Sequence, residues 1–129
     1  MIIPYFTGDL SERMNTLGDI LAEKTGIRLV GSSFGGLMGT LFALENEARV
    51  ERLVLLAPAI NLMSQIDHVP KTIAVPVWLY HGYKDEVIPL KEVEAAANQI
   101  FSNLSFHKVE DDHFLHGTFK HIDWDRLLT

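Results

Sequence analysis

The stretch of sequence that decides the fold is RLVGSSFGGLM, residues 28–38. An apolar, strand-like run enters a turn at Gly31, and apolar residues at helical spacing follow from Phe34 onward. Ser33 lies in this turn, with a glycine two residues before it and another two residues after it. A G-x-S-x-G pattern between a strand and a helix is typical of a nucleophile elbow. The turn is so tight that we expect both Gly31 and Gly35 to be required there, because a side chain at either position would clash.

Apolar runs of strand length alternate with segments of helical period along the rest of the chain. Strands are expected over residues 1–6, 28–31, 52–57, 75–81 and 105–109. Helices are expected over residues 10–21, 34–42, 90–101 and 119–128. The three middle strands are apolar on both faces, which is typical of a parallel sheet covered by helices. The sequence therefore predicts a three-layer α/β/α fold around a mainly parallel sheet of about five strands.

Length and composition indicate one soluble domain over residues 1–129. Of these residues 47% are apolar, which is enough for one hydrophobic core. The net charge of −6, from 11 Lys and Arg against 17 Asp and Glu, makes a nucleic acid or an anionic membrane an unexpected partner. The sequence shows no signal peptide and no apolar run of membrane-spanning length. It also has no cysteine, which excludes disulfides and fits a reducing compartment, so we expect a cytoplasmic protein.

Candidates for a catalytic base and its supporting acid follow Ser33 at the ends of later strands. A serine hydroxyl needs such a base, which a carboxylate in turn orients. Asp85 lies in HGYKDEVIP, residues 81–89, after the strand at 75–81, and His113 lies in EDDHF, residues 110–114, after the strand at 105–109. Function in α/β folds sits beyond the carboxyl ends of the strands. The helix that follows Ser33 would also direct the Phe34 N–H toward an oxyanion.

The order serine, aspartate, histidine at these strand ends resembles the α/β-hydrolase superfamily. Its members carry G-x-S-x-G, then an acid loop like H-G-x-x-D-x-x-V/I-P, then a histidine loop like D-H, and this chain has all three in that order. The resemblance covers about residues 1–129, as the later part of that fold. It implies that Ser33 is the nucleophile, that His113 is the general base and then acid, and that Asp85 orients His113. The Phe34 N–H would be one oxyanion donor.

The resemblance further implies a serine hydrolase that acts on small carboxylic esters. No cofactor and no metal are expected, and the partner is a small-molecule ester substrate. Only about 16 residues separate Ala59 from Ala74, where larger relatives insert a cap, so the site is expected to be shallow and open. Its expected apolar lining comprises Phe34, Leu62, Met63, Ile88 and Phe114.

The chain departs from the superfamily pattern before Ser33. Further strands usually stand there, and a loop after one of them, often reading H-G, supplies the second oxyanion donor; no H-G precedes Ser33 here. In one placement, residues 1–6 correspond to the strand just before the nucleophile strand, and the oxyanion strand is then missing. In the other placement, residues 1–6 are the oxyanion strand itself, and the turn at residues 6–9 lies opposite Ser33. A third arrangement completes the sheet with a second copy in a homo-oligomer. The alternative function is accordingly a catalytically silent binding module.

Neighbouring polar residues have structural interpretations that we prefer. Ser32 lacks the flanking pair of glycines and is expected to be a buried hydroxyl bonded to the main chain. His81 is expected to pack under the acid loop. The carboxylates of Asp111 and Asp112 are expected to be solvated or to cap the next turn; with His113 and His116 they would suit zinc only if a third ligand group were present.

Overall fold

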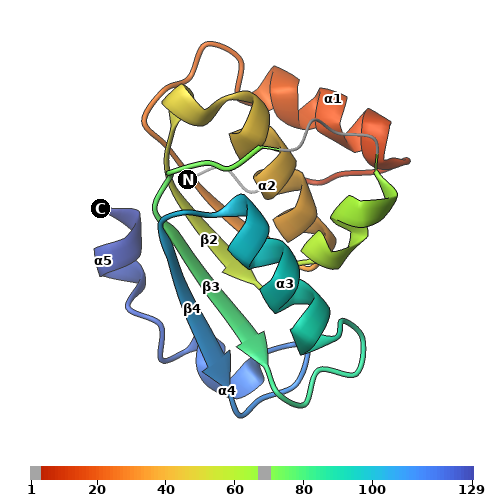
Figure 1. The fold of residues 1–129 in the computed structure, drawn as a ribbon. Coiled ribbons are helices and arrows are strands. Elements are labelled where there is room, and N and C mark those ends of the chain that lie inside the picture. Colours follow the sequence, from red (N-terminus) through yellow and green to blue (C-terminus); the bar gives the residue numbers. More distant parts are fainter. Residues whose placement is uncertain (1–3, 67–70) are drawn as a thin grey trace.

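A parallel sheet of four strands forms the centre of the molecule (Figure 1). The computed structural model describes residues 4–66 and 71–129. The strands lie side by side in chain order and are β1 (Ile27–Ser32), β2 (Val50–Leu56), β3 (Val77–Gly82) and β4 (Leu104–Val109). All three strand pairs are parallel, so the four carboxyl ends lie at one end of the sheet.

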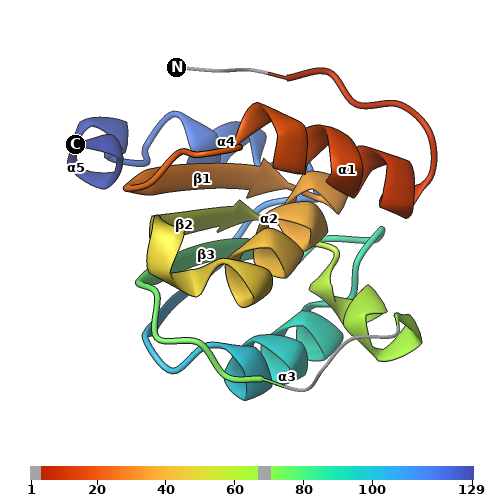
Figure 2. The same cartoon turned by 90° about the horizontal axis from the view of Figure 1, so that it is seen from above.

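Helices cover both faces of this sheet (Figure 2). On one face lie α1 (Leu10–Ile20), α2 (Phe34–Glu45) and α3 (Leu90–Ile100), and on the other lies the short α5 (Trp124–Leu128). The side chains of β2 alternate between the two layers: Leu53 and Leu55 pack in the larger core, whereas Val54 and Leu56 pack in a smaller core with Leu127. Period-two alternation with apolar residues on both faces is what a sheet buried on both sides requires. The predicted three-layer α/β/α fold is confirmed.

The first two helices begin in different ways, α1 at a capping box and α2 at the turn that follows β1. The carboxylate of Asp9 accepts a hydrogen bond from the Glu12 N–H at 2.8 Å, and the Glu12 side chain returns to the Asp9 N–H, which together form a capping box. In contrast, α2 begins directly at the turn after β1 and has no side-chain cap. Most of α2 is buried, which fits its position against the centre of the sheet.

The structure differs from the prediction at both ends of the chain. Residues 4–6 form no strand, and residues 1–3 lie outside the described residues, so the described sheet has four strands rather than about five. An apolar segment becomes a strand only where a neighbouring strand offers hydrogen bonds and packing, and Pro4 has no N–H to give.

Of the helix predicted over residues 119–128, only the last part is formed, as α5, while the separate short helix α4 (His116–Phe119) ends where the predicted helix was to begin. The late start of α5 follows from Asp123, whose side chain accepts a hydrogen bond from the Arg126 N–H and caps the helix. Two 3₁₀ turns, η1 (Glu47–Arg49) and η2 (Ile60–Gln65), complete the described elements. No helix in the described parts of the chain is both long enough and apolar enough to cross a bilayer.

Candidate active site

Ser33 occupies a strained turn at the carboxyl end of β1. Its backbone has φ 54° and ψ −117°, a region that non-glycine residues rarely adopt. Hydrogen bonds on both sides hold this conformation: the Ser33 N–H donates to the Leu56 carbonyl at 2.9 Å, and the Ser33 carbonyl accepts from the Ala59 N–H at 2.8 Å. The neighbouring strand β2 and the residues after it therefore fix the position of the serine.

Two glycines give this turn the room that it needs, and only one of them, Gly31, is a glycine of the motif. A Cβ atom on Gly31 would lie 2.4 Å from the Gly35 carbonyl oxygen, so residue 31 must be glycine. A Cβ atom on Gly35 meets no heavy atom within 4 Å, which makes the expected requirement for glycine at position 35 wrong. The second requirement falls on Gly36, where a Cβ atom would lie 2.6 Å from the Cβ of Pro58.

The structure brings Ser33, His113 and Asp85 together at the carboxyl end of the sheet. The Nε2 atom of His113 lies 3.2 Å from the Ser33 Oγ, and its Nδ1 atom lies 2.8 Å from the Asp85 Oδ2. The Asp85 side chain is fully buried, and the His113 side chain is 12% exposed. A carboxylate on Nδ1 favours the tautomer with hydrogen there, which leaves the Nε2 lone pair free to accept the serine proton.

Asp85 stays ionised because of the hydrogen bonds it accepts. Its Oδ1 atom accepts hydrogen bonds from the N–H groups of Val87 and Ile88, both at 2.8 Å. Burial by itself would raise the pKa of this carboxyl, but the hydrogen bonds from Ile88, His113 and Val87 together hold its pKa below the ordinary value. The ionised form is the one that can stabilise a positive charge on His113.

The histidine loop is held by its own carboxylates and by the acid loop beside it. Asp112 accepts hydrogen bonds from the N–H groups of Phe114 and Leu115, and Asp111 accepts from the N–H and hydroxyl of Thr118. These carboxylates therefore cap the turn after His113, one of the two roles expected for them. The main chain at Asp111 also presses on Gly82, where a Cβ atom would lie 2.1 Å from the Asp111 oxygen. Sequence reasoning did not find this requirement, since nothing local connects residues 82 and 111.

The Phe34 N–H is the first amide of α2 and lies next to Ser33, at the positive end of the helix dipole. The Phe34 ring is covered by the Arg13 guanidinium, 5.1 Å from the ring centroid, and Arg13 donates to the Gly8 carbonyl at 2.8 Å. Residues 6–9 thus approach Phe34 through Arg13. Both placements of the first segment made it a strand, and neither is seen over residues 4–6, which form no strand; residues 1–3 lie outside the described residues.

Several expectations for neighbouring residues need correction. Ser32 is exposed rather than buried. His81 is fully buried as expected, but besides packing it approaches Asp85, with Nε2 3.3 Å from Oδ2. Of the expected apolar lining, Met63 and Ile88 belong to the buried core, whereas Phe114 is 70% exposed.

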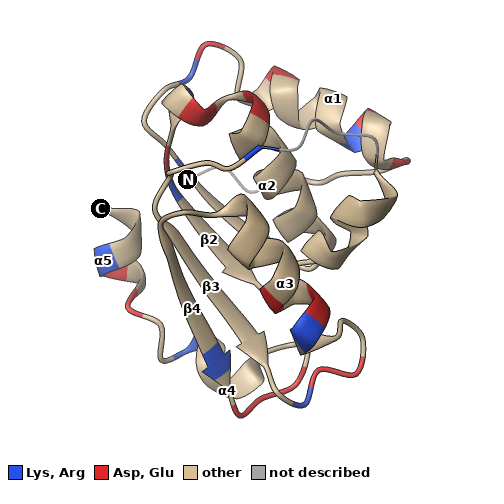
Figure 3. Ribbon diagram, in the orientation of Figure 1, with Lys and Arg blue, Asp and Glu red and all other residues tan. Residues whose placement is uncertain are grey.

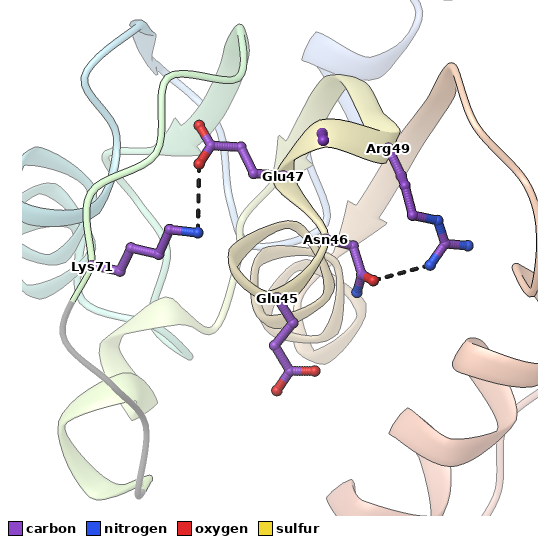
Figure 4. A pocket seen from close by; sticks show the side chains of 6 residues that line it. Glu45, Asn46, Glu47, Arg49 and Lys71 are labelled. Atoms are coloured by element: carbon purple, nitrogen blue, oxygen red, sulfur yellow. Dashed lines mark hydrogen bonds and ion pairs between the residues drawn. The ribbon is translucent and has the colours of Figure 1, made fainter.

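Two large hollows lie away from the three residues. One has a volume of about 630 Å³ and lies at the amino end of β2 (Figure 4). Its lining is Glu45, Asn46, Glu47, Ala48, Arg49 and Lys71. Two of the charged side chains there have a partner in the lining: Lys71 lies 3.5 Å from Glu47, and Arg49 donates to the side-chain oxygen of Asn46 at 2.9 Å. A second hollow, of about 670 Å³, lies between α1 and α2. Neither contains Ser33, Asp85 or His113.

Known structures share this architecture. The chain is similar to the α/β hydrolase domain-containing protein 10 from mouse, with a TM-score of 0.69 and 21% identity over 82% of this chain and 62% of that one. An α/β serine hydrolase homologue from Coxiella burnetii gives a TM-score of 0.66 and 25% identity over 85% of this chain and 53% of that one. An esterase from Exiguobacterium antarcticum gives a TM-score of 0.72 and 14% identity over 94% of this chain and 74% of that one. The chain thus spans only 62% and 53% of the first two proteins.

The sequence supports the same relationship. No curated protein sequence matches the chain. The phospholipase/carboxylesterase family matches it over residues 10–126, which include the elbow, the acid loop and the histidine loop. The chain therefore belongs to the phospholipase/carboxylesterase family of the α/β-hydrolase superfamily.

Proposed function

We propose that the chain is a serine hydrolase that cleaves small carboxylic esters through an acyl-enzyme on Ser33. The observation that carries this proposal is the continuous hydrogen-bond path from the Ser33 Oγ through His113 to the buried Asp85. In this arrangement the serine hydroxyl is hydrogen-bonded to a base, and a carboxylate is hydrogen-bonded to the other nitrogen of that base. Such an arrangement activates an otherwise weak nucleophile.

In the first half of the reaction, the Nε2 atom of His113 takes the proton from the Ser33 Oγ while that oxygen attacks the ester carbonyl carbon. The carbonyl oxygen becomes an oxyanion, which the Phe34 N–H stabilises at the start of α2. Asp85 stabilises the imidazolium that forms on His113. His113 then gives its Nε2 proton to the leaving alcohol oxygen, the ester C–O bond breaks, and the acyl group stays on Ser33.

The second half repeats these steps with water. His113 removes a proton from a water molecule, the resulting hydroxide attacks the acyl carbon, and the second oxyanion forms beside Phe34. When that intermediate collapses, the bond to the Ser33 Oγ breaks and His113 returns the proton to this oxygen. The acid product leaves, and the chain is restored with no net change in its protonation.

The charge around the site favours a neutral substrate. Acidic residues gather in the loops that follow β3 and β4 (Figure 3), among them Glu86 and Glu110. Lys84 offsets part of this charge, since it lies 3.5 Å from Glu110. A cluster of carboxylates repels an anionic acyl group, whereas a neutral ester experiences no such repulsion. We therefore propose a small neutral carboxylic ester as the substrate class.

We further propose a location, a domain organisation and an absence of cofactors for this enzyme. We place it in the cytoplasm, because the chain has no cysteine, and treat residues 1–129 as one domain with no cofactor and no metal. The competing function is a silent binding module of the same fold. The observation in its favour is that, among the described residues, β1 has no partner strand on its outer side, where a second oxyanion donor would be carried.

A fluorophosphonate probe tests the proposal without knowledge of the substrate. Intact-mass and peptide-mapping experiments should find one adduct, on Ser33, which is lost in Ser33→Ala and in His113→Ala. Ser32→Ala is the matched control: this neighbouring serine is exposed and outside the hydrogen-bond path, so the variant should label at the wild-type rate. A folded wild type that takes no label would support the binding module instead.

A further inference from the structure

His81 places a second imidazole on the carboxylate of Asp85. It is the next-to-last residue of β3, and its side chain is fully buried. Its Nε2 atom lies 2.9 Å from the Ile88 carbonyl oxygen and 3.3 Å from the Asp85 Oδ2. The same Oδ2 atom lies 2.8 Å from the Nδ1 of His113. One carboxylate oxygen therefore faces two histidines, and the reaction as described above uses only His113.

The surroundings of His81 select one of its tautomers. The Ile88 carbonyl can only accept a hydrogen bond, so the Nε2 atom that faces it must carry hydrogen. The Nδ1 atom is buried, and the described residues give it no hydrogen-bond partner. A hydrogen there would be an unpaired buried donor, which is costly. The Nε2–H tautomer is the one that fits the site.

This N–H group closes the loop that carries Asp85. Ile88 is held at both of its main-chain groups, because its N–H donates to the Asp85 Oδ1 at 2.8 Å and its carbonyl accepts from His81. Val87 donates to the same Oδ1, also at 2.8 Å. The carboxylate thus accepts three hydrogen bonds, from Val87 and Ile88 on Oδ1 and from His113 on Oδ2, and the His81 Nε2 lies 3.3 Å from Oδ2. Such a set of contacts leaves it little freedom to rotate.

We propose that His81 is a positioning residue for the triad, whose Nε2–H donates to the Ile88 carbonyl and lies beside the Asp85 Oδ2, and so holds the acid loop and its carboxylate in the orientation that His113 needs. The inference rests on the proposed function, since it gives His81 a role in the same site. Without this donor, the acid loop loses a link to β3. The hydrogen bond between Asp85 and His113 then lengthens, and the imidazolium is less stabilised.

Two amide variants of His81 differ in the reach of their nitrogen and form a matched pair. The amide nitrogen of His81→Gln extends to the place of Nε2, whereas that of His81→Asn extends only to the place of Nδ1. We expect fluorophosphonate labelling of Ser33 to be about tenfold slower in His81→Asn and within about threefold of wild type in His81→Gln. In the Asn variant, the midpoint of the curve of labelling rate against pH should also move to lower pH, because a less stabilised imidazolium loses its proton more readily.

A purely structural role for His81 would lower the melting temperature of the variants and leave these midpoints in place. Equal rates and equal midpoints in wild type, His81→Gln and His81→Asn would overturn the proposal while leaving the nucleophile on Ser33 intact. If His81→Asn does not fold, His81→Leu serves as the variant without a donor, and its comparison with His81→Gln has the same expected outcome.

Proton and nitrogen NMR give a readout that needs no catalysis. The low-field resonance of the His113 Nδ1–H, assigned by its loss in His113→Ala, should persist in His81→Gln and shift or broaden in His81→Asn. In the wild type, the imidazole nitrogen shifts should show His81 as the Nε2–H tautomer; the Nδ1–H tautomer would contradict the proposal. If the wild type takes no fluorophosphonate, the proposed function fails and these resonances alone decide the role of His81.

Discussion

The glycines of the elbow allow a sharp test of the geometry, because alanine at Gly31 and alanine at Gly35 should have opposite effects on stability. A Cβ atom on residue 31 would lie 2.4 Å from the Gly35 oxygen and 2.9 Å from the Gly36 Cα, whereas ordinary contacts begin at 3.4 Å. The backbone would have to move by about 1 Å, in a turn that hydrogen bonds hold on both sides. Overpacking of this kind costs about 3 kcal/mol.

Gly35→Ala is the matched control within the same motif. It adds the same methyl group only two positions after Ser33, but that group meets no heavy atom within 4 Å. Because residue 35 is helical, alanine there should stabilise the protein by about 0.5 kcal/mol. The two variants should therefore differ by about 3.5 kcal/mol in the free energy of unfolding, or by roughly 10 °C in melting temperature.

Urea unfolding followed by circular dichroism measures this difference, with the slope of the transition checked for equality among the variants. Gly36→Ala provides an independent arm and should be destabilised, because its Cβ atom would lie 2.6 Å from the Cβ of Pro58. The reasoning is refuted if Gly31→Ala is as stable as the wild type, or if Gly35→Ala loses as much stability as Gly31→Ala does.

Three further predictions concern charged groups. Asp85→Asn should slow fluorophosphonate labelling by about 10³- to 10⁴-fold, the scale seen in serine-protease triads, because the neutral amide cannot stabilise the His113 imidazolium; wild-type rates would contradict this role. Burial would raise the pKa of Asp111, but hydrogen bonds from Asp112, Thr118 and Gly117 hold this pKa below its ordinary value of 3.8. The Asp111 carboxylate therefore stabilises the fold above pH 3.8, and this stabilisation is lost as the pH falls through the lower pKa of the folded state. The urea midpoints of Asp111→Asn and the wild type should accordingly converge over this acid range, and a constant difference between them would exclude the effect. Asp9→Ala removes the capping box and should cost about 1 kcal/mol in urea unfolding, with no change in the labelling of Ser33.

The three residues that the structure brings together were predictable because each stands in a short motif at the end of a strand. The carboxyl ends of parallel strands meet at one end of a sheet, so Ser33, Asp85 and His113 converge even though 80 residues separate the first from the last. The triad roles given to them, and that of the Phe34 N–H, remain predictions until labelling is measured.

Features that depend on distant neighbours were not predictable. The segment at residues 1–6 has strand composition, but its described part, residues 4–6, forms no strand, because strand formation depends on a partner that composition does not supply. The need for glycine at position 36 comes from Pro58, and that at position 82 comes from Asp111, so neither follows from local spacing. Sequence patterns also gave no sign that the His81 Nε2 faces a main-chain carbonyl, since that contact exists only once the acid loop has folded back on β3.

The backbone conformation of Ser33 limits which side chains this turn accepts. At φ 54° a side chain with two heavy atoms on Cβ collides with the main chain, whereas one with a single γ atom fits. Cysteine therefore fits at position 33 and threonine does not, although threonine carries the same hydroxyl. For the nucleophile that we propose at Ser33, branching at Cβ thus limits the choice before any difference in acidity or nucleophilicity between oxygen and sulfur has an effect.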